Sequence, residues 1–178
     1  MEEKQPTAIS NGLMYGLITG VILIFFGLIL FLTDLYLNKY VSWISYLLLT
    51  GGMIYGTLEF RKKQPNGYIS YGKSFSSCFW IGLFAGILTS IYMFVFAKFI
   101  HPGLQQEMLE QVRTNMAANQ ASMTEEQMDQ AIAMTAKFMS PGIMAFFSVL
   151  MYSFASAVIA LILAIFLKKE DPALKITN

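Results

Sequence analysis

The sequence predicts an all-α membrane protein: a four-transmembrane-helix bundle with an extracytoplasmic amphipathic helical hairpin between the third and fourth transmembrane helices. Apolar residues make up 56% of the 178 residues and charged residues 13%, whereas soluble domains average about 45–50% and about 25%. Four stretches approach the length of about 20 apolar residues that crosses the bilayer core. A soluble bundle would carry charges on the outer face of each helix, and these stretches have none. We therefore expect residues 1–178 to form a single membrane domain.

The four expected spans cover residues 13–33, 41–58, 75–97 and 143–167, and a charged residue follows each: Asp34, Glu59, Lys98 and Lys168. The second span is the least apolar, because it contains serines, a threonine and two adjacent glycines. Tyr40 and Trp43 frame its start, where aromatic side chains suit the membrane interface. The first span follows an acidic lead-in rather than a basic one and lacks a small-residue cleavage site, so we expect a retained helix and not a signal peptide.

Small residues recur at four-residue spacing in every span, which places them on one face of each helix. Such faces let helix backbones approach closely in lipid. We expect them to pack the bundle within one chain, and homodimerisation through one face is the alternative. The predicted helix-packing residues are Gly12, Gly16, Gly20, Gly52, Gly56, Gly82, Gly86, Ser156, Ala160 and Ala164.

Basic residues set the expected orientation. The termini and the second loop together hold eight Lys and Arg residues, and the other two loops hold four. Because cytoplasmic segments are enriched in Lys and Arg, both termini should be cytoplasmic. The main support is a cytoplasmic basic cluster of Arg61, Lys62, Lys63 and Lys73.

Residues 102–140 form the long loop, which is too polar for the bilayer and shows helical periodicity. One stripe is Leu104, Met108, Val112 and Met116, and a second is Met128, Ala131, Ile132, Thr135 and Met139. Thr124 and Gln127 fit a capping box, and residues 119–122 fit the turn between two helices. We therefore predict a helical hairpin outside the membrane. Its methionines, with His101 nearby, raise copper binding as an alternative, but flexible gap-filling side chains on apolar stripes explain them better.

Residues 67–74 match the phosphate-loop pattern G-x-x-x-x-G-K-S. That pattern binds nucleotide only between a strand and a helix, with an acidic metal partner. Here expected transmembrane helices flank it on both sides, so we read it as an interfacial turn and expect no nucleotide.

The sequence gives little support for a catalytic site or for a cofactor-binding site. The chain has one cysteine, Cys78, and one histidine, His101, so metal clusters of either kind cannot be built within it. Cys78 is expected to be a buried inert thiol and His101 a solvated side chain. The net charge is +1, which gives no case for nucleic acid. We expect no enzyme activity, no catalytic residue, no metal and no cofactor.

Several segments together resemble a bacterial membrane-protein family, domain of unknown function 4199. These are the Glu2-Glu3-Lys4 lead-in, the glycine stripe of the first span, the loop at residues 67–74, the segment at 123–128 and the Ser140-Pro141-Gly142 start of the last span. Asn66 stands where the family pattern has glycine. The resemblance runs from about residue 10 to residue 169 and implies the architecture and a bacterial inner-membrane location, without catalytic residues.

Three functions remain in view. A non-enzymatic scaffold or accessory subunit is favoured by the small-residue faces, the uncharged spans and the hairpin. A small oligomeric transporter or channel is the first alternative, and lipid or copper handling at the outer hairpin is the second. The expected partners are the lipid bilayer and a second copy or another membrane protein.

Overall fold

The computed structural model describes residues 6–36, 38–119 and 124–169. Within them the chain forms six α-helices, which confirms the all-α class. Their bounds are α1 (Ala8–Leu32), α2 (Lys39–Lys62), α3 (Tyr71–Val95), α4 (Leu104–Asn119), α5 (Glu125–Phe138) and α6 (Pro141–Leu167). A 3-10 turn, η1 (Pro65–Gly67), precedes α3, and a π-helical turn, η2 (Phe96–Ile100), continues it.

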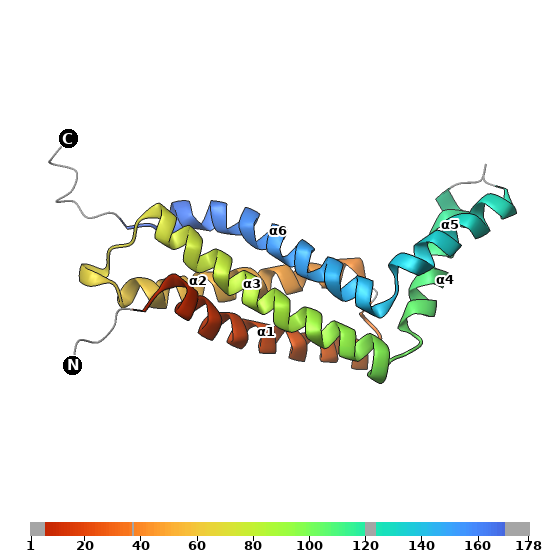
Figure 1. The fold of residues 1–178 in the computed structure, drawn as a ribbon, viewed down its shortest axis with the longest axis horizontal. Coiled ribbons are helices and arrows are strands. Elements are labelled where there is room, and N and C mark those ends of the chain that lie inside the picture. The colour runs from red at the N-terminus through yellow and green to blue at the C-terminus, as the bar shows by residue number, and fades with distance from the viewer. Residues whose placement is uncertain (1–5, 37, 120–123, 170–178) are drawn as a thin grey trace. The chain divides into compact units, whose positions relative to one another are not determined.

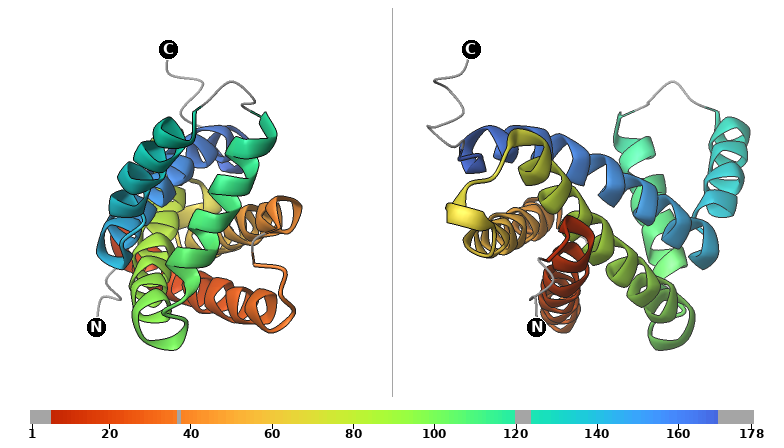
Figure 2. Two further views of the ribbon diagram at one scale, coloured as in Figure 1. Left: turned by 90° about the vertical axis from the view of Figure 1, so that its right-hand side faces the viewer. Right: turned by 60° about the vertical axis from the view of Figure 1, so that its left-hand side comes forward.

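The chain divides into two compact units, so that α3 and α6 each contribute to both. The bundle unit comprises residues 1–89 and 149–178, and the hairpin unit comprises residues 90–148. In the bundle unit the long helices lie side by side (Figure 1). In the hairpin unit α4 and α5 lie against each other (Figure 2).

Three helices in the described chain are long and apolar enough to cross a membrane: residues 8–32, 71–100 and 141–167. These agree with three of the four predicted spans and support a membrane protein. Helix α2 is nearly as long as α1, with 24 residues against 25. Its tyrosine, serine, threonine and glycine content explains why composition alone does not place it with the other three.

Helix α1 alternates two inward residues with two outward residues. The buried residues are Asn11, Gly12, Tyr15, Gly16, Thr19, Gly20 and Leu23, and the exposed residues between them are Leu13, Met14, Leu17, Ile18, Val21 and Ile22. Small and polar side chains therefore face the bundle, and large apolar side chains face outward. This pattern is the opposite of the pattern in the helix of a water-soluble protein, and it suits a helix that is surrounded by lipid.

Local side-chain bonds set most helix starts. Thr7 accepts the backbone N–H of Ser10 at 3.1 Å, and Asn38 accepts that of Tyr40 at 3.0 Å. Between α2 and α3 the backbone reverses through Asn66 (φ 57°) and Gly67 (φ 67°), where the left-handed conformation is easiest for asparagine and glycine. This agrees with the turn predicted from Pro65-Asn66-Gly67.

The hairpin unit contains the predicted second helix with its capping box. Thr124 Oγ1 accepts the Gln127 N–H at 3.3 Å, and the Gln127 side chain accepts the Thr124 N–H at 3.2 Å. The stripe residues of both helices are buried or half-buried, while their neighbours are mostly exposed. Residues 120–122 of the predicted turn lie outside the described chain, and Asn119 ends α4.

Candidate functional site

The glycine stripe of α1 lies directly against α3. A Cβ atom added to Gly12 would collide with Trp80, one on Gly16 would lie 2.8 Å from the Ile81 carbonyl oxygen, and one on Gly20 would lie 2.9 Å from Leu88. The contact of Gly16 with the Ile81 oxygen is a contact with backbone, which rotation of a side chain cannot relieve. The residue numbers rise together on the two helices, so α1 and α3 run parallel and in close contact.

The remaining predicted packing residues meet within the same unit. Gly52 and Gly56 of α2 lie against Thr19 and Tyr15 of α1. Gly82 and Gly86 of α3 lie against Ser156 and Tyr152 of α6, and Ser156, Ala160 and Ala164 are buried. The structure thus brings all ten small residues into contacts inside one chain, and the small faces join α1, α2, α3 and α6.

A buried cluster of polar side chains connects α1, α2 and α3. Asn11 Nδ2 donates to the Gly56 carbonyl oxygen at 3.0 Å and to Ser77 Oγ at 3.1 Å. Thr57 Oγ1 donates to Ser77 Oγ at 3.1 Å. All three side chains are at most 4% exposed. Because buried polar groups are costly when unpaired, these bonds fix the register of three helices at once.

Cys78 belongs to the same cluster. Its Sγ lies 3.2 Å from Thr57 Oγ1 and 4.0 Å from the Met53 carbonyl oxygen, and the residue is fully buried. Either atom can be the donor in the Cys78–Thr57 pair, and the thiol is the donor toward the Met53 carbonyl oxygen. The cysteine therefore acts as a weak donor inside a closed network, in keeping with the buried thiol predicted from sequence.

Two further serines lie on the faces that meet in this unit. Ser74 is one turn before Ser77 on α3, and Ser156 faces Gly82; both are fully buried. Within the described chain neither hydroxyl has a hydrogen-bond partner. Serine in a transmembrane helix commonly bonds the carbonyl one turn earlier, so neither position by itself indicates a ligand.

The end of the bundle unit that carries the basic cluster is tied together by backbone bonds. Ile69 and Lys169 form an antiparallel bridge, with N–H···O distances of 2.8 and 2.9 Å. Arg61 Nη1 donates to the Leu167 carbonyl oxygen at 3.2 Å, which satisfies an end of α6. The loop before α3 is thereby attached to the last turn of α6.

The basic cluster does not act as one patch of free cations. Lys62 pairs with Glu59 at 2.5 Å, and Lys73 Nζ donates to Gln64 Oε1 at 3.3 Å. Arg61 is bound to α6 as described, and Lys63 is exposed. Three of the four predicted cations therefore have a specific structural partner.

The phosphate-loop-like segment sits between two helices. Gly67 ends the turn η1, residues 68–70 lead from it to α3, and Gly72, Lys73 and Ser74 lie in the first turn of α3. Ser70 Oγ accepts the Lys73 N–H at 3.4 Å and caps this turn. A helix, not a strand, precedes the segment, as predicted from the sequence, so its surroundings differ from those that bind phosphate.

His101 belongs to the hairpin unit and differs from the expectation of a solvated side chain. Its Nε2 lies 3.1 Å from Glu107 Oε1, and the side chain is 23% exposed. The bond is local, because Glu107 is on the first turn of α4. Among the described residues no group of three or more His, Cys, Asp or Glu side chains is placed to hold a metal.

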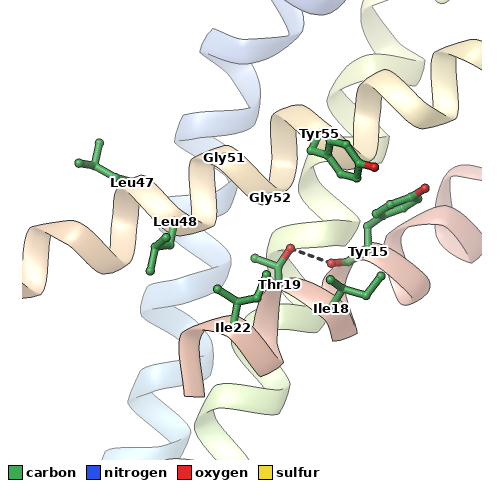
Figure 3. Close-up of a pocket in the computed structure, with 9 residues that line it drawn as sticks. All are labelled: Tyr15, Ile18, Thr19, Ile22, Leu47, Leu48, Gly51, Gly52 and Tyr55. Atoms are coloured by element: carbon green, nitrogen blue, oxygen red, sulfur yellow. Dashed lines mark hydrogen bonds between the residues drawn. The ribbon is translucent and has the colours of Figure 1, made fainter. Parts of the chain in front are cut away.

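A groove between α1 and α2 was not predicted. It has a volume of about 310 Å³, at the lower end of the size of ligand sites. Figure 3 shows its lining, which α1 and α2 supply together. The residues from α1 are Tyr15, Ile18, Thr19 and Ile22, and those from α2 are Leu47, Leu48, Gly51, Gly52 and Tyr55. The one bond drawn there runs from Thr19 Oγ1 to the Tyr15 carbonyl oxygen at 2.7 Å.

The rings of Tyr15 and Tyr55 meet at one end of this groove. Their centroids are 5.8 Å apart in an edge-to-face arrangement. Tyr15 is 8% exposed and Tyr55 61%, so one ring forms the wall and the other lies at the surface. The sequence signal for this site was the adjacent glycine pair, of which only Gly52 belongs to the predicted packing stripe.

Comparison with known proteins gives one result. The family model described as "Protein of unknown function (DUF4199)" matches residues 14–169. The chain belongs to this family. Searches of curated proteins and of solved structures gave no match. The DUF4199 match begins within α1 and ends at Lys169, the residue that bridges to Ile69. It therefore includes the groove, all but the first residue of the polar cluster, and the complete hairpin unit.

Proposed function

We propose that this DUF4199 protein is a non-enzymatic scaffold or accessory subunit of the bacterial cytoplasmic membrane. In this proposal α1, α2, α3 and α6 all cross the bilayer. The N- and C-terminal segments and the loop before α3 are cytoplasmic, and α4 and α5 lie outside. The observation that carries the proposal is that the small residues and polar side chains of the bundle interior are used to hold helices together.

Three observations support α2 as the fourth span. Asn11 of α1 bonds the Gly56 carbonyl of α2, and Thr19 contacts Gly52, so the two helices run antiparallel. At 1.5 Å per residue, the 24 residues of α2 extend about 36 Å, which exceeds the hydrocarbon thickness of about 30 Å. The Arg61-Lys62-Lys63 cluster lies at the C-terminal end of α2, and the positive-inside rule favours the cytoplasm for that end.

Co-purification tests the scaffold proposal. Epitope-tagged protein extracted in a mild detergent is expected to elute with a second copy or another membrane protein in a fixed ratio. Cross-linking in intact membranes before extraction provides the reference for complexes lost in detergent. A lone monomer both after cross-linking and after mild extraction contradicts the proposal.

Solute flux separates the scaffold from the transporter alternative. Liposomes containing the purified protein are expected to retain a trapped fluorescent dye and a potassium gradient as well as protein-free liposomes do. The matched control is the Asn11→Ala variant. Because this substitution loosens the polar cluster, the flux through the variant measures the leakage that poor helix packing alone causes. Flux in the natural protein above that control supports a channel or transporter instead.

A further inference from the structure

The α1–α2 groove continues into a pair of opposite charges on the same face of α2. Leu48, Gly52, Tyr55, Glu59 and Lys62 follow one another at spacings of four, three, four and three residues. Residues with this spacing form one stripe along a helix. The stripe therefore runs from the groove lining, through Tyr55, to the Glu59–Lys62 ion pair, which lies beyond the end of the groove.

The ion pair lies close to the tyrosine end of the groove. Glu59 is 22% exposed and Lys62 70%, with 2.5 Å between Oε1 and Nζ. A positive and a negative group thus stand together one to two helical turns beyond Tyr55.

The lengths along α2 fit one leaflet of a bilayer, if α2 crosses the membrane as proposed above. Leu47 to Tyr55 covers about 12 Å, and Tyr55 to Lys62 about 10 Å, at 1.5 Å per residue. One leaflet offers about 15 Å of hydrocarbon and roughly 5–7 Å of headgroup region. The apolar groove therefore lies at acyl-chain depth, the tyrosines at the interface and the ion pair at headgroup depth.

We propose that the α1–α2 groove binds one acyl chain of a cytoplasmic-leaflet phospholipid whose headgroup carries both a phosphate and a primary ammonium group. Lys62 donates to the phosphate, and Glu59 accepts from the ammonium. The phenol hydroxyls of Tyr15 and Tyr55 lie where the ester groups of such a lipid would be. Charge complementarity selects this headgroup, because a purely anionic lipid would satisfy Lys62 and be repelled by Glu59.

Gly51 offers a direct way to fill the groove. A Cβ atom built on Gly51 has no heavy atom within 4 Å, whereas one on Gly52 would collide with Thr19. A leucine at position 51 therefore occupies the groove without disturbing the α1–α2 contact. Gly142 is also exposed, with open space around its Cβ position, and lies in the hairpin unit, so it supplies the matched control.

Lipid retention tests the proposal. Full-length protein is reconstituted in nanodiscs of phosphatidylethanolamine and phosphatidylglycerol with equal amounts and identical acyl chains, and the lipids that remain bound are counted by native mass spectrometry. The natural protein is expected to keep one lipid, with phosphatidylethanolamine enriched about two- to fivefold, as weak exposed charge pairs allow. Gly51→Leu should lose that lipid, and Gly142→Leu should keep it.

The headgroup contacts have their own variants. Glu59→Gln should keep one lipid but shift the preference toward phosphatidylglycerol, and Lys62→Gln should weaken retention of both lipids. If Gly51→Leu cannot be purified, Ile18→Trp fills the same groove from α1, where Ile18 is 49% exposed.

Three results would overturn the lipid site: bound lipid in the same ratio as the bilayer, equal retention by Gly51→Leu and Gly142→Leu, or a Gly51→Leu effect on dimerisation instead of on lipid. The last result assigns the groove to a second copy. None of these results depends on whether the protein serves as a scaffold or a transporter, which is tested separately by co-purification and flux.

Discussion

The α1–α3 contact of the bundle unit and the α4–α5 contact of the hairpin unit both repeat about every four residues, but they are built by opposite means. In α1 three glycines lie directly against α3 and the polar Asn11 and Thr19 also face inward, whereas most of the large apolar side chains point outward. In α4 and α5 the apolar stripe points inward and charged residues point outward, with Leu104 buried and no buried residue among those described in α5. A contact built on small residues suits helices that meet in lipid, and a contact built on an apolar stripe suits helices that meet in water.

The difference predicts where a substitution does most harm. Gly16→Leu should have the largest effect, because its Cβ position is 2.8 Å from a backbone oxygen of α3. Overpacking typically costs about 1–3 kcal/mol and occasionally more, and a contact with backbone falls at the upper end. Thermal unfolding in detergent, followed by circular dichroism, should show a large fall in Tm, while Gly51→Leu serves as the control with a small change. Equal stability of the two variants would mean that the α1–α3 contact is not close.

Asn11→Ala should have the second-largest effect. It removes the donor to both the Gly56 carbonyl and Ser77 in the buried cluster. Hydrogen bonds between membrane helices are typically worth about 0.6–2 kcal/mol, so the loss of both should lower the unfolding free energy by about 1–2 kcal/mol. A double-mutant cycle with Ser77→Ala measures the coupling free energy between the two side chains. Additive effects of the two substitutions would show that the two side chains are not coupled.

Thr124→Ala should affect the hairpin unit alone. It removes one half of the capping box at the start of α5, a change that costs about 1 kcal/mol. Hydrogen–deuterium exchange of the full chain should quicken at residues 125–128 and stay unchanged in α1. Thr114→Ala is the control, since Thr114 bonds only a carbonyl within α4. Faster exchange in α1 would indicate that the two units unfold together.

The exposed pair Arg113–Asp129 should matter least. Its atoms are 3.5 Å apart, and both side chains are more than 60% exposed. Such pairs contribute about 0–1 kcal/mol and are screened by salt. Arg113→Ala should leave exchange in α4 and α5 within error of the natural protein at 0.5 M salt. A clear loss of protection there would mean that charges, and not the apolar stripe, hold the two helices.

Much of the fold could be predicted from the sequence, because hydrophobicity and capping act locally. The apolar runs located α1, α3 and α6, and the Thr124–Gln127 spacing located the start of α5. The helix ends were less well predicted. The first span was expected to begin at residue 13, but α1 begins at Ala8, since the buried Asn11 is paired across helices and its polarity does not end the helix.

The sites depend on which helices pack against each other, and the local sequence of a helix does not determine its neighbours. Asn11, Thr57 and Ser77 are separated by 46 and 20 residues, and no spacing rule joins them. Gly51 and Gly52 are adjacent and look equivalent in the sequence, yet one lines open space and the other contacts Thr19. The amino-acid composition of residues 96–100 also does not indicate the π-helical turn that they form.

The proposed membrane crossing of α2 decides which end of the bundle unit is cytoplasmic and how deep in the bilayer the groove lies. Single cysteines at Leu35 and Lys63, introduced in a Cys78→Ala background, flank α2 on its two sides. An impermeant maleimide applied to intact spheroplasts should label Leu35→Cys at once and Lys63→Cys only after permeabilisation. Labelling of both positions from the same side would contradict a fourth span.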